Sequence, residues 1–518
     1  MIGRSRREFL ADVGRGAIAA GIGAGLAGDL GLAPARADGP DRLTFGPLEP
    51  LVGLMHDTPP DKLQPILVNK LRDGVELREL VAAAALANAR TFGGEDYTGF
   101  HTLMALAPAF HMAGEMPADK RALPVLKVIY RNANRIQERG VNAGEVLHAV
   151  NPVPLPEGQS RGELLREAVR KQDMTGAESM FATMAGGPAA EAFAALLVAV
   201  EDALDVHRIV LPWRAWCLLD IVGPENAHTL LRQSVRYCVK EESPRVVDRY
   251  APVRALLPQV MDKFHLTSGP KGTRAVDDAW VDGMSDTIFR SKPEHSAEAV
   301  AGALADGVDP AAVGEAISLA ANQLVLRDSG RLPGQTAPNK PVGSVHGDSI
   351  GVHACDSANA WRQMARVGGP RHAAACLVLG AYQVAWDRVE RGGNFLEWKP
   401  RPWAEHKAAV ESNDPARLMQ NAEDAIRSND QARACAVVAK LGEVNHSPRA
   451  VFDLLLRYAV SEEGALHAEK YYRTVSEEFT AIRPSFRWRQ LVALARVTAS
   501  ECGTPAAGQA DARRLLGV

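Results

Sequence analysis

Four histidines stand at matching places in this chain, at His101, His207, His353 and His467. Each opens a stretch with helical spacing, and a tyrosine follows the first three by 29 or 30 residues. Neutral imidazole is the commonest protein ligand for iron, copper and zinc, and ligands on separate helices can point at one ion. The four residues are therefore predicted to bind a redox metal such as iron or copper. The alternative is a repeated structural device, in which each imidazole bonds a carbonyl of the preceding turn.

A glycine-punctuated loop leads into the third of these helices and carries His346 and Asp348. A loop histidine beside a repeated one suggests a lid or a general acid/base. Asp356, one turn beyond His353, is a further carboxylate that could orient an imidazole. We assign His346, Asp348 and Asp356 to the catalytic set, while a surface loop histidine and solvated helix caps remain the alternative. The chain contains no H-E-x-x-H, H-x-H or C-x-x-C motif.

Aromatic and basic side chains near the same helix starts could contact a substrate. Aromatic rings could line a cavity for an aromatic substrate, and the basic residues could bind an anionic or phenolate group. Apolar core packing and pairing with neighbouring acids are the alternatives. The predicted substrate-binding residues are Tyr97, Trp213, Arg214, Trp361, Arg362 and Lys470.

Several phrases of the sequence occur twice. Leu-Arg-Asp-Gly-Val-Glu at 71–76 returns as Ala-Asp-Gly-Val-Asp at 305–309, and the segment 135–140 returns at 387–392. The chain is therefore predicted to be a tandem duplication of helical hairpins, with its two halves in a pseudo-twofold arrangement. The halves are 38–260 and 261–518, and together they form one integrated catalytic domain.

Composition favours an all-α fold, because helix-forming residues dominate and β-branched alternation is scarce. The 518 residues carry a net charge of −3 and only 6% aromatic residues. No basic block is present, so nucleic acid is not expected as a partner. The six cysteines lie in apolar helical patterns and are expected to be buried free thiols, although a disulfide remains open for an exported protein.

The first 37 residues have the form of a twin-arginine signal peptide. Ser5 to Leu10 reads S-R-R-x-F-L, a Gly/Ala-rich stretch follows, and Ala35-Arg36-Ala37 is an A-x-A cleavage site. We therefore expect the export machinery as a partner and a periplasmic or secreted location. No other apolar run reaches about 18 residues, so no transmembrane anchor is expected after cleavage. The mature chain has no G-x-S-x-G, P-loop or strand-borne G-x-G-x-x-G, so neither a flavin nor an NAD(P) motif is found.

The order of these units resembles the questin oxidase-like family. The resemblance covers about residues 50–500 and rests on short motifs around the four histidines. They are Phe100-His101-Thr102-Leu103-Met104-Ala105-Leu106, Val206-His207-Arg208, Val352-His353 through Asn359-Ala360-Trp361-Arg362, and His467-Ala468-Glu469-Lys470.

The resemblance implies an all-helical oxidoreductase. Fungal members open the ring of an anthraquinone oxidatively with dioxygen and reduced nicotinamide. This chain departs from the pattern in its export signal and in a longer loop at 327–348, so only the redox class and the histidine positions are carried over. The resulting hypothesis is an exported oxidoreductase that oxidises a small molecule, such as a quinone-like aromatic, at a metal- and dioxygen-dependent histidine site. The alternative is a non-catalytic helical-repeat scaffold with structural histidines.

Overall fold

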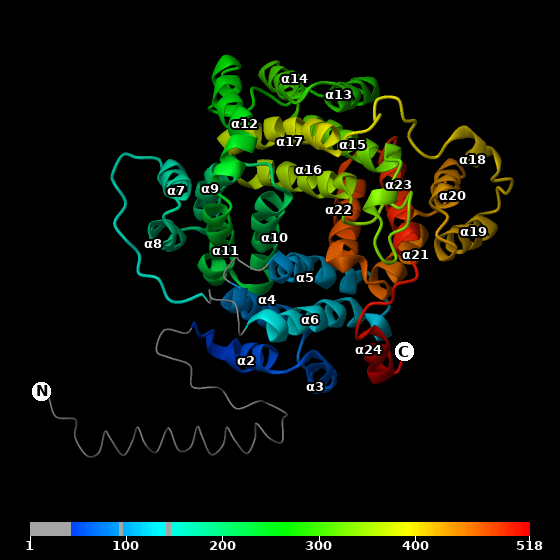
Figure 1. Ribbon diagram of the computed structural model, residues 1–518, viewed down its shortest axis with the longest axis horizontal. Coiled ribbons are helices and arrows are strands. Elements are labelled where there is room, and N and C mark those ends of the chain that lie inside the picture. The colour runs from blue at the N-terminus through cyan, green and yellow to red at the C-terminus, as the bar shows by residue number, and fades with distance from the viewer. Residues whose placement is uncertain (1–42, 93–96, 141–146) are drawn as a thin grey trace, which may run out of the picture.

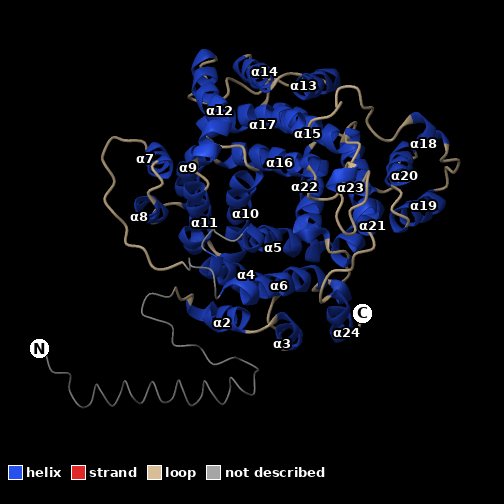
Figure 2. Ribbon diagram, viewed as in Figure 1, coloured by secondary structure: helices blue, strands red, loops and turns tan. Residues whose placement is uncertain are grey.

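The computed structural model describes residues 43–92, 97–140 and 147–518, and within them every regular element is a helix (Figure 2). The expected all-α fold is confirmed. The predicted signal peptide, residues 1–37, lies outside the described residues. No helix of the described part is both long and apolar enough to cross a membrane.

The helices run as follows. Up to residue 263 they are α2 (Glu49–Asp57), α3 (Pro60–Arg72), α4 (Leu77–Phe92), α5 (Tyr97–Glu115), α6 (Leu123–Arg135), α7 (Arg161–Arg170), α8 (Met174–Ala185), α9 (Ala189–Val200), α10 (Val206–Val222), α11 (Ala227–Lys240) and α12 (Pro244–Lys263). Beyond residue 263 they are α13 (Asp278–Arg290), α14 (Pro293–Ala305), α15 (Pro310–Arg327), α16 (Ile350–Val367), α17 (Pro370–Arg391), α18 (Ala404–Ala408), α19 (Pro415–Arg427), α20 (Gln431–Glu443), α21 (Pro448–Ser461), α22 (His467–Ala481), α23 (Arg487–Glu501) and α24 (Gln509–Leu516). Single turns connect them at η1 (Gly46–Leu48), η2 (Ala118–Lys120), η3 (Ile136–Gly140), η4 (Pro224–Asn226), η5 (Pro333–Gln335) and η6 (Gly464–Leu466).

Short polar side chains begin several of these helices. The Asp205 carboxylate caps α10 by accepting from the backbone N–H groups of His207 and Arg208, and the Ser349 hydroxyl caps α16. Such caps satisfy N–H groups that have no partner inside the helix. The two helices that carry His207 and His353 therefore begin at positions that the sequence specifies locally.

Four inner helices form a closed ring. Helix α5 packs against α10 and α22, and α16 packs against the same two helices. Figure 1 shows these four around the centre of the molecule, backed by α4, α6, α11, α15, α17 and α23. The four inner helices are those that carry the four repeated histidines. The ring is therefore the scaffold that positions the candidate site.

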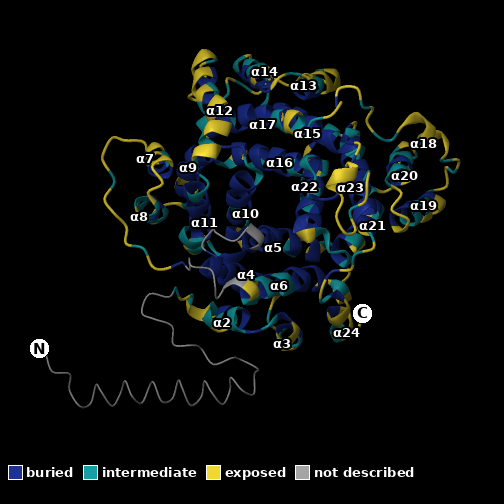
Figure 3. Ribbon diagram, in the orientation of Figure 1, coloured by how far each residue is buried: buried dark blue, intermediate teal, exposed yellow. Residues whose placement is uncertain are grey.

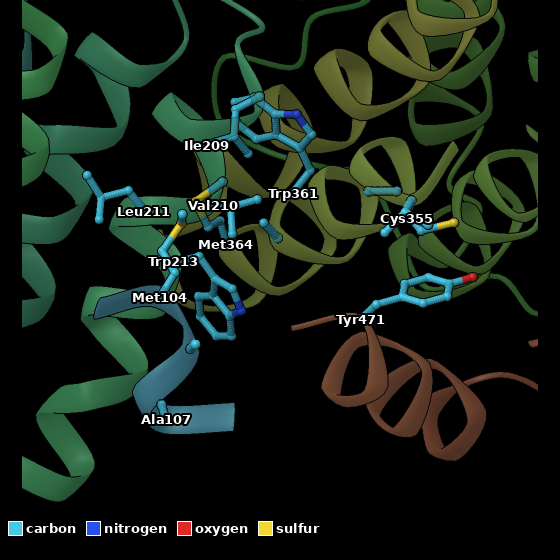
Figure 4. Packing of buried hydrophobic residues seen from close by; sticks show 14 of the residues in the cluster. Met104, Ala107, Ile209, Val210, Leu211, Trp213, Cys355, Trp361, Met364 and Tyr471 are labelled. Carbon is cyan, nitrogen blue, oxygen red and sulfur yellow. The ribbon is translucent and has the colours of Figure 1, made fainter. Parts of the chain in front are cut away.

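Burial follows this arrangement. The inner helices are mostly buried, whereas exposed residues gather on outer elements such as α7, α12, α18 and α19 (Figure 3). Figure 4 shows part of the apolar core that the ring helices share, including Met104 of α5, Trp213 of α10, Trp361 of α16 and Tyr471 of α22. All six cysteines are free thiols, and four are buried.

One of the repeated phrases has the same local structure at both of its positions, whereas 136–140 forms a π-helical turn and the matching 387–391 ends the α-helix α17. Asp73 ends α3 and Asp306 ends α14, and each is followed by a glycine with positive φ, Gly74 at +97° and Gly307 at +78°. A left-handed residue after a helix end is the usual place for glycine. The tandem duplication itself and the division at 260 stay predictions.

Candidate four-histidine centre

The four repeated histidines meet in the middle of the helix ring. The Nε2 atoms of His101 and His207 are 3.2 Å apart, and those of His353 and His467 are 3.1 Å apart. The two pairs adjoin each other: ring centroids are 5.3 Å apart for His101 and His467 and 6.1 Å apart for His207 and His353. Each imidazole therefore contacts imidazoles on both neighbouring helices of the ring.

Helix starts deliver the four side chains. His207 is the second residue of α10, His353 the fourth of α16, and His467 the first of α22. The turn before His467 is unusual, because Ala465 and Leu466 have φ values of +47° and +64°. Left-handed conformations cost non-glycine residues about 1–2 kcal/mol each. Such strain persists only where the surrounding structure imposes it, and it is common at functional sites.

Burial keeps the second histidine pair neutral at neutral pH. Loss of solvation, with the nearby Lys470 ammonium, lowers the pKa of His353 to about 3. The same causes lower the pKa of His467 well below its ordinary value. A neutral imidazole has one nitrogen with a free lone pair. The pair is therefore suited to hold a proton between its nitrogens or to donate lone pairs to a cation.

A carboxylate lies beside the Nδ1 atom of the His207 ring. Asp205 Oδ1 is 3.4 Å from His207 Nδ1 and also accepts a hydrogen bond of 2.8 Å from the Tyr237 hydroxyl. Burial raises the pKa of Asp205, but the hydrogen bonds from His207 and Tyr237 outweigh it and hold the pKa below its usual range. An ionised carboxylate at Nδ1 favours the Nδ1–H tautomer. That tautomer turns the Nε2 lone pair of His207 toward His101.

The loop before α16 covers the second pair. Gly347 donates its N–H to the Glu501 carboxylate at 2.7 Å, and a Cβ added at Gly347 would lie 2.4 Å from the Cβ of His467. His346 is buried on the same loop, burial lowers its pKa to about 4, and its Nε2 has no described partner. Asp348 instead pairs with Arg331 at 2.6 Å and Lys340 at 2.5 Å. His346 and Asp348 thus lie on a loop that adjoins the cluster. The Asp348 carboxylate forms its ion pairs within that loop.

Replacing Gly347 by alanine is expected to disturb the cluster without unfolding the protein. The new methyl group would overlap His467 Cβ, and Glu501 Oε1 would be 3.0 Å away, so the loop or the imidazole must move. We expect a loss of at least about 1 kcal/mol in stability and a changed NMR signal of His467. Gly334→Ala, with open space at its Cβ, is the control. Unchanged histidine signals in Gly347→Ala would contradict the close packing.

Three predicted polar residues share the inward faces of their helices. Asp356 follows His353 by three residues, Lys470 follows His467 by three, and Arg214 follows His207 by seven. At about 3.6 residues per turn these spacings return to the face of the histidine. All three are buried. Burial lowers the pKa of Lys470 to about 8 and raises that of Asp356.

The other predicted substrate residues have intramolecular roles or are undescribed. Trp361 is fully buried and donates its indole N–H to Gln383 Oε1 at 2.7 Å, and Arg362 forms an ion pair with Glu478 at 2.6 Å. Trp213 is buried, and no described residue accepts from its indole N–H. Tyr97 opens α5, but its side chain lies outside the described residues. Trp361 and Arg362 therefore have the packing and pairing roles that we had kept as alternatives.

Sequence reasoning missed two residues of this interior. Thr474 donates its hydroxyl to Asp356 at 2.7 Å, and it follows His467 by seven residues, so helical periodicity could have identified it. Glu501 ends α23 and contacts the loop glycine; burial raises its pKa to about 7. No local pattern marks Glu501, because its contact depends on the packing of distant segments.

The donor atoms of the two pairs are not gathered around one point. Among the described residues, no group of three or more histidine, cysteine, aspartate or glutamate side chains has the arrangement of a metal site. The chain matches no family model, no curated protein and no solved structure with which it was compared.

Proposed function

We propose that this chain is an exported oxidoreductase of the questin oxidase-like type, and that the four-histidine cluster is its centre. The observation that carries the proposal is the meeting of four imidazoles from four separate helices at one buried place. The export signal, the location and the family are parts of the proposal that rest on the sequence motifs alone.

The contacts of the histidines argue against a purely local role. A repeated structural device would bond each imidazole to its own preceding turn. Here the Nε2 contacts instead join different helices, 106 residues apart for one pair and 114 for the other. The left-handed turn before His467 adds strain to reach this position. A protein gains little stability from gathering polar rings in its core, so a function at the cluster accounts for them better.

The four imidazoles supply the nitrogen donors that iron and copper take, although the two pairs are not gathered around one point. Two nitrogens on one tetrahedral ion lie about 3.3 Å apart when the metal–nitrogen bonds are about 2.0–2.1 Å, and the two Nε2 pairs are close to this separation. The pairs would have to approach each other to share an ion. When bound, iron or copper would supply one-electron chemistry with dioxygen. Asp205 would hold the His207 tautomer, and His346, on the loop that covers His467, would be a group able to move a proton.

The test is the metal content of the exported protein, measured by plasma mass spectrometry beside a His101→Ala, His353→Ala double variant. We expect nearly stoichiometric iron or copper in the parent and its loss from a variant that remains helical by circular dichroism. The exposed His295→Ala variant is the control and should retain the metal. Oxygen uptake with phenolic and quinone substrates follows.

The absence of metal from both proteins, with the double variant only less stable, would contradict the proposed metal centre. The cluster would then be a metal-free acid/base site or a structural one.

A further inference from the structure

Two buried cationic side chains beside the cluster lack a full set of acceptors. Lys470 is 3% exposed, and among the described residues only charge–charge interactions, without a hydrogen bond, act on its ammonium. Arg214 is 2% exposed; its Nη2 donates to the Thr474 hydroxyl at 3.1 Å, while its Nε has no described acceptor. Buried donors are almost always satisfied, so the unpartnered Nε of Arg214 requires an explanation.

The acids nearby do not supply the missing acceptors. The charges acting on the Lys470 ammonium are those of Asp356, Arg214 and Glu469. Glu469 lies 2.6 Å from the ammonium of Lys127 and is balanced by it. Asp356 accepts from Thr474 at 2.7 Å. One interior carboxylate thus faces two cations, Lys470 and Arg214.

A further acid, Glu477, does not change this balance. It is 3.7 Å from Arg214 but only 2.7 Å from Arg473, with which it pairs along α22. The starts of α10, α16 and α22 add the positive ends of three helix dipoles to the same interior. The surroundings of Lys470 and Arg214 therefore have an excess of positive charge, next to the neutral imidazoles of His353 and His467.

We infer that Lys470 and Arg214 bind the anionic oxygen of a small-molecule substrate, a phenolate, enolate or carboxylate, beside the four-histidine cluster. The inference rests on the proposed function, because it places the substrate next to that cluster. An anionic oxygen would accept from the Lys470 ammonium and the free Arg214 N–H and would restore the charge balance. Asp356, held by Thr474, would keep the two cations apart and in position. Charge-assisted hydrogen bonds of this kind are strong and directional.

The test uses 4-nitrophenol, whose phenolate form absorbs visible light, with benzoate and benzyl alcohol as competing ligands. We expect the full-length protein to bind the phenolate form, so that the visible band grows at a pH where the free dye is mostly protonated. Benzoate should displace the dye, and neutral benzyl alcohol should not. Lys470→Met should weaken dye binding by about tenfold or more, the effect of one charge-assisted hydrogen bond. Lys470→Arg, which keeps the charge, should retain much of the binding.

Several outcomes would overturn the inference: no binding of either anion, equal competition by benzyl alcohol, or unchanged binding in a folded Lys470→Met variant. Metal content separates this failure from that of the proposed function. If the protein contains metal but does not prefer the two anions to neutral benzyl alcohol, the proposed metal centre stands and the anion site is contradicted. If the protein contains no metal but binds anions in a Lys470-dependent way, the anion site stands and the redox centre is contradicted.

Discussion

Replacing Glu478 by alanine is expected to cost about 3–5 kcal/mol of stability, because the change leaves a buried charge without its partner. Glu478 of α22 is 2% exposed and accepts from Arg362 at 2.6 Å and from Asn359 at 2.8 Å, both on α16. In the variant the Ala481 carbonyl, at 3.5 Å, would be the one acceptor left to the Arg362 guanidinium among the described residues. Urea unfolding followed by circular dichroism measures the loss.

The same ion pair joins α16 and α22, the two helices that carry His353 and His467. Glu478→Ala is therefore also expected to loosen the 3.1 Å contact between these histidines. The double variant Arg362→Met, Glu478→Leu leaves no buried charge and should lose much less stability than Glu478→Ala. Asp286→Ala, which removes a half-exposed partner of Arg290, should change stability by less than about 1 kcal/mol. If Glu478→Ala also loses less than about 1 kcal/mol, the ion pair between α16 and α22 contributes little to stability.

Acid is expected to destabilise the protein partly through His346, and replacing this residue by asparagine should remove that part of the effect. Burial lowers the pKa of His346 to about 4 in the folded protein, from an ordinary value of 6.5. Below pH 6.5 the unfolded chain binds a proton that the folded protein does not, so the stability from this group is complete above pH 6.5 and is lost as the pH falls toward 4. Between pH 7 and pH 5 the loss is about 2 kcal/mol.

The measurement compares unfolding free energies of the parent and His346→Asn at pH 7 and pH 5. The comparison between proteins is needed because Glu501 acts in the opposite direction: burial raises its pKa to about 7, so its protonation favours the folded state as the pH falls from 7. Asp348, Lys340 and Arg331 also face His346 and are the same in both proteins. His295→Asn, at an exposed position, is the control. Equal acid sensitivity in parent and His346→Asn would contradict a buried neutral His346.

Helical phase explains which of the predicted basic residues lie on the same helix face as the histidines. Arg214 and Lys470 stand seven and three residues after their histidines and therefore return to the inward face. Arg362 stands nine residues after His353, half a turn out of phase, and it pairs with Glu478 instead. Tracking the phase from each histidine would have separated these residues. The apolar environment of Trp361 could also be expected from the sequence, since large aromatic side chains are usually core residues.

Other contacts were beyond any local pattern. Gly347 touches His467 across 120 residues of chain, and Glu501 receives the Gly347 N–H although nothing near it in sequence marks it. Asp348 was expected to support the cluster, but two cations of its own loop hold its carboxylate. Such pairings depend on how the loop folds back, and helical periodicity carries no information about that.

The sequence by itself determined the helical class, the helix starts that carry the histidines and the inward residues that follow them in phase. Composition, capping side chains and the 3.6-residue period are local properties, so they can be read before the chain is folded. Only the tertiary structure decided that the four imidazoles meet, and in which pairs. That outcome depends on α5, α10, α16 and α22 closing into a ring, and the closure comes from packing between segments more than 100 residues apart.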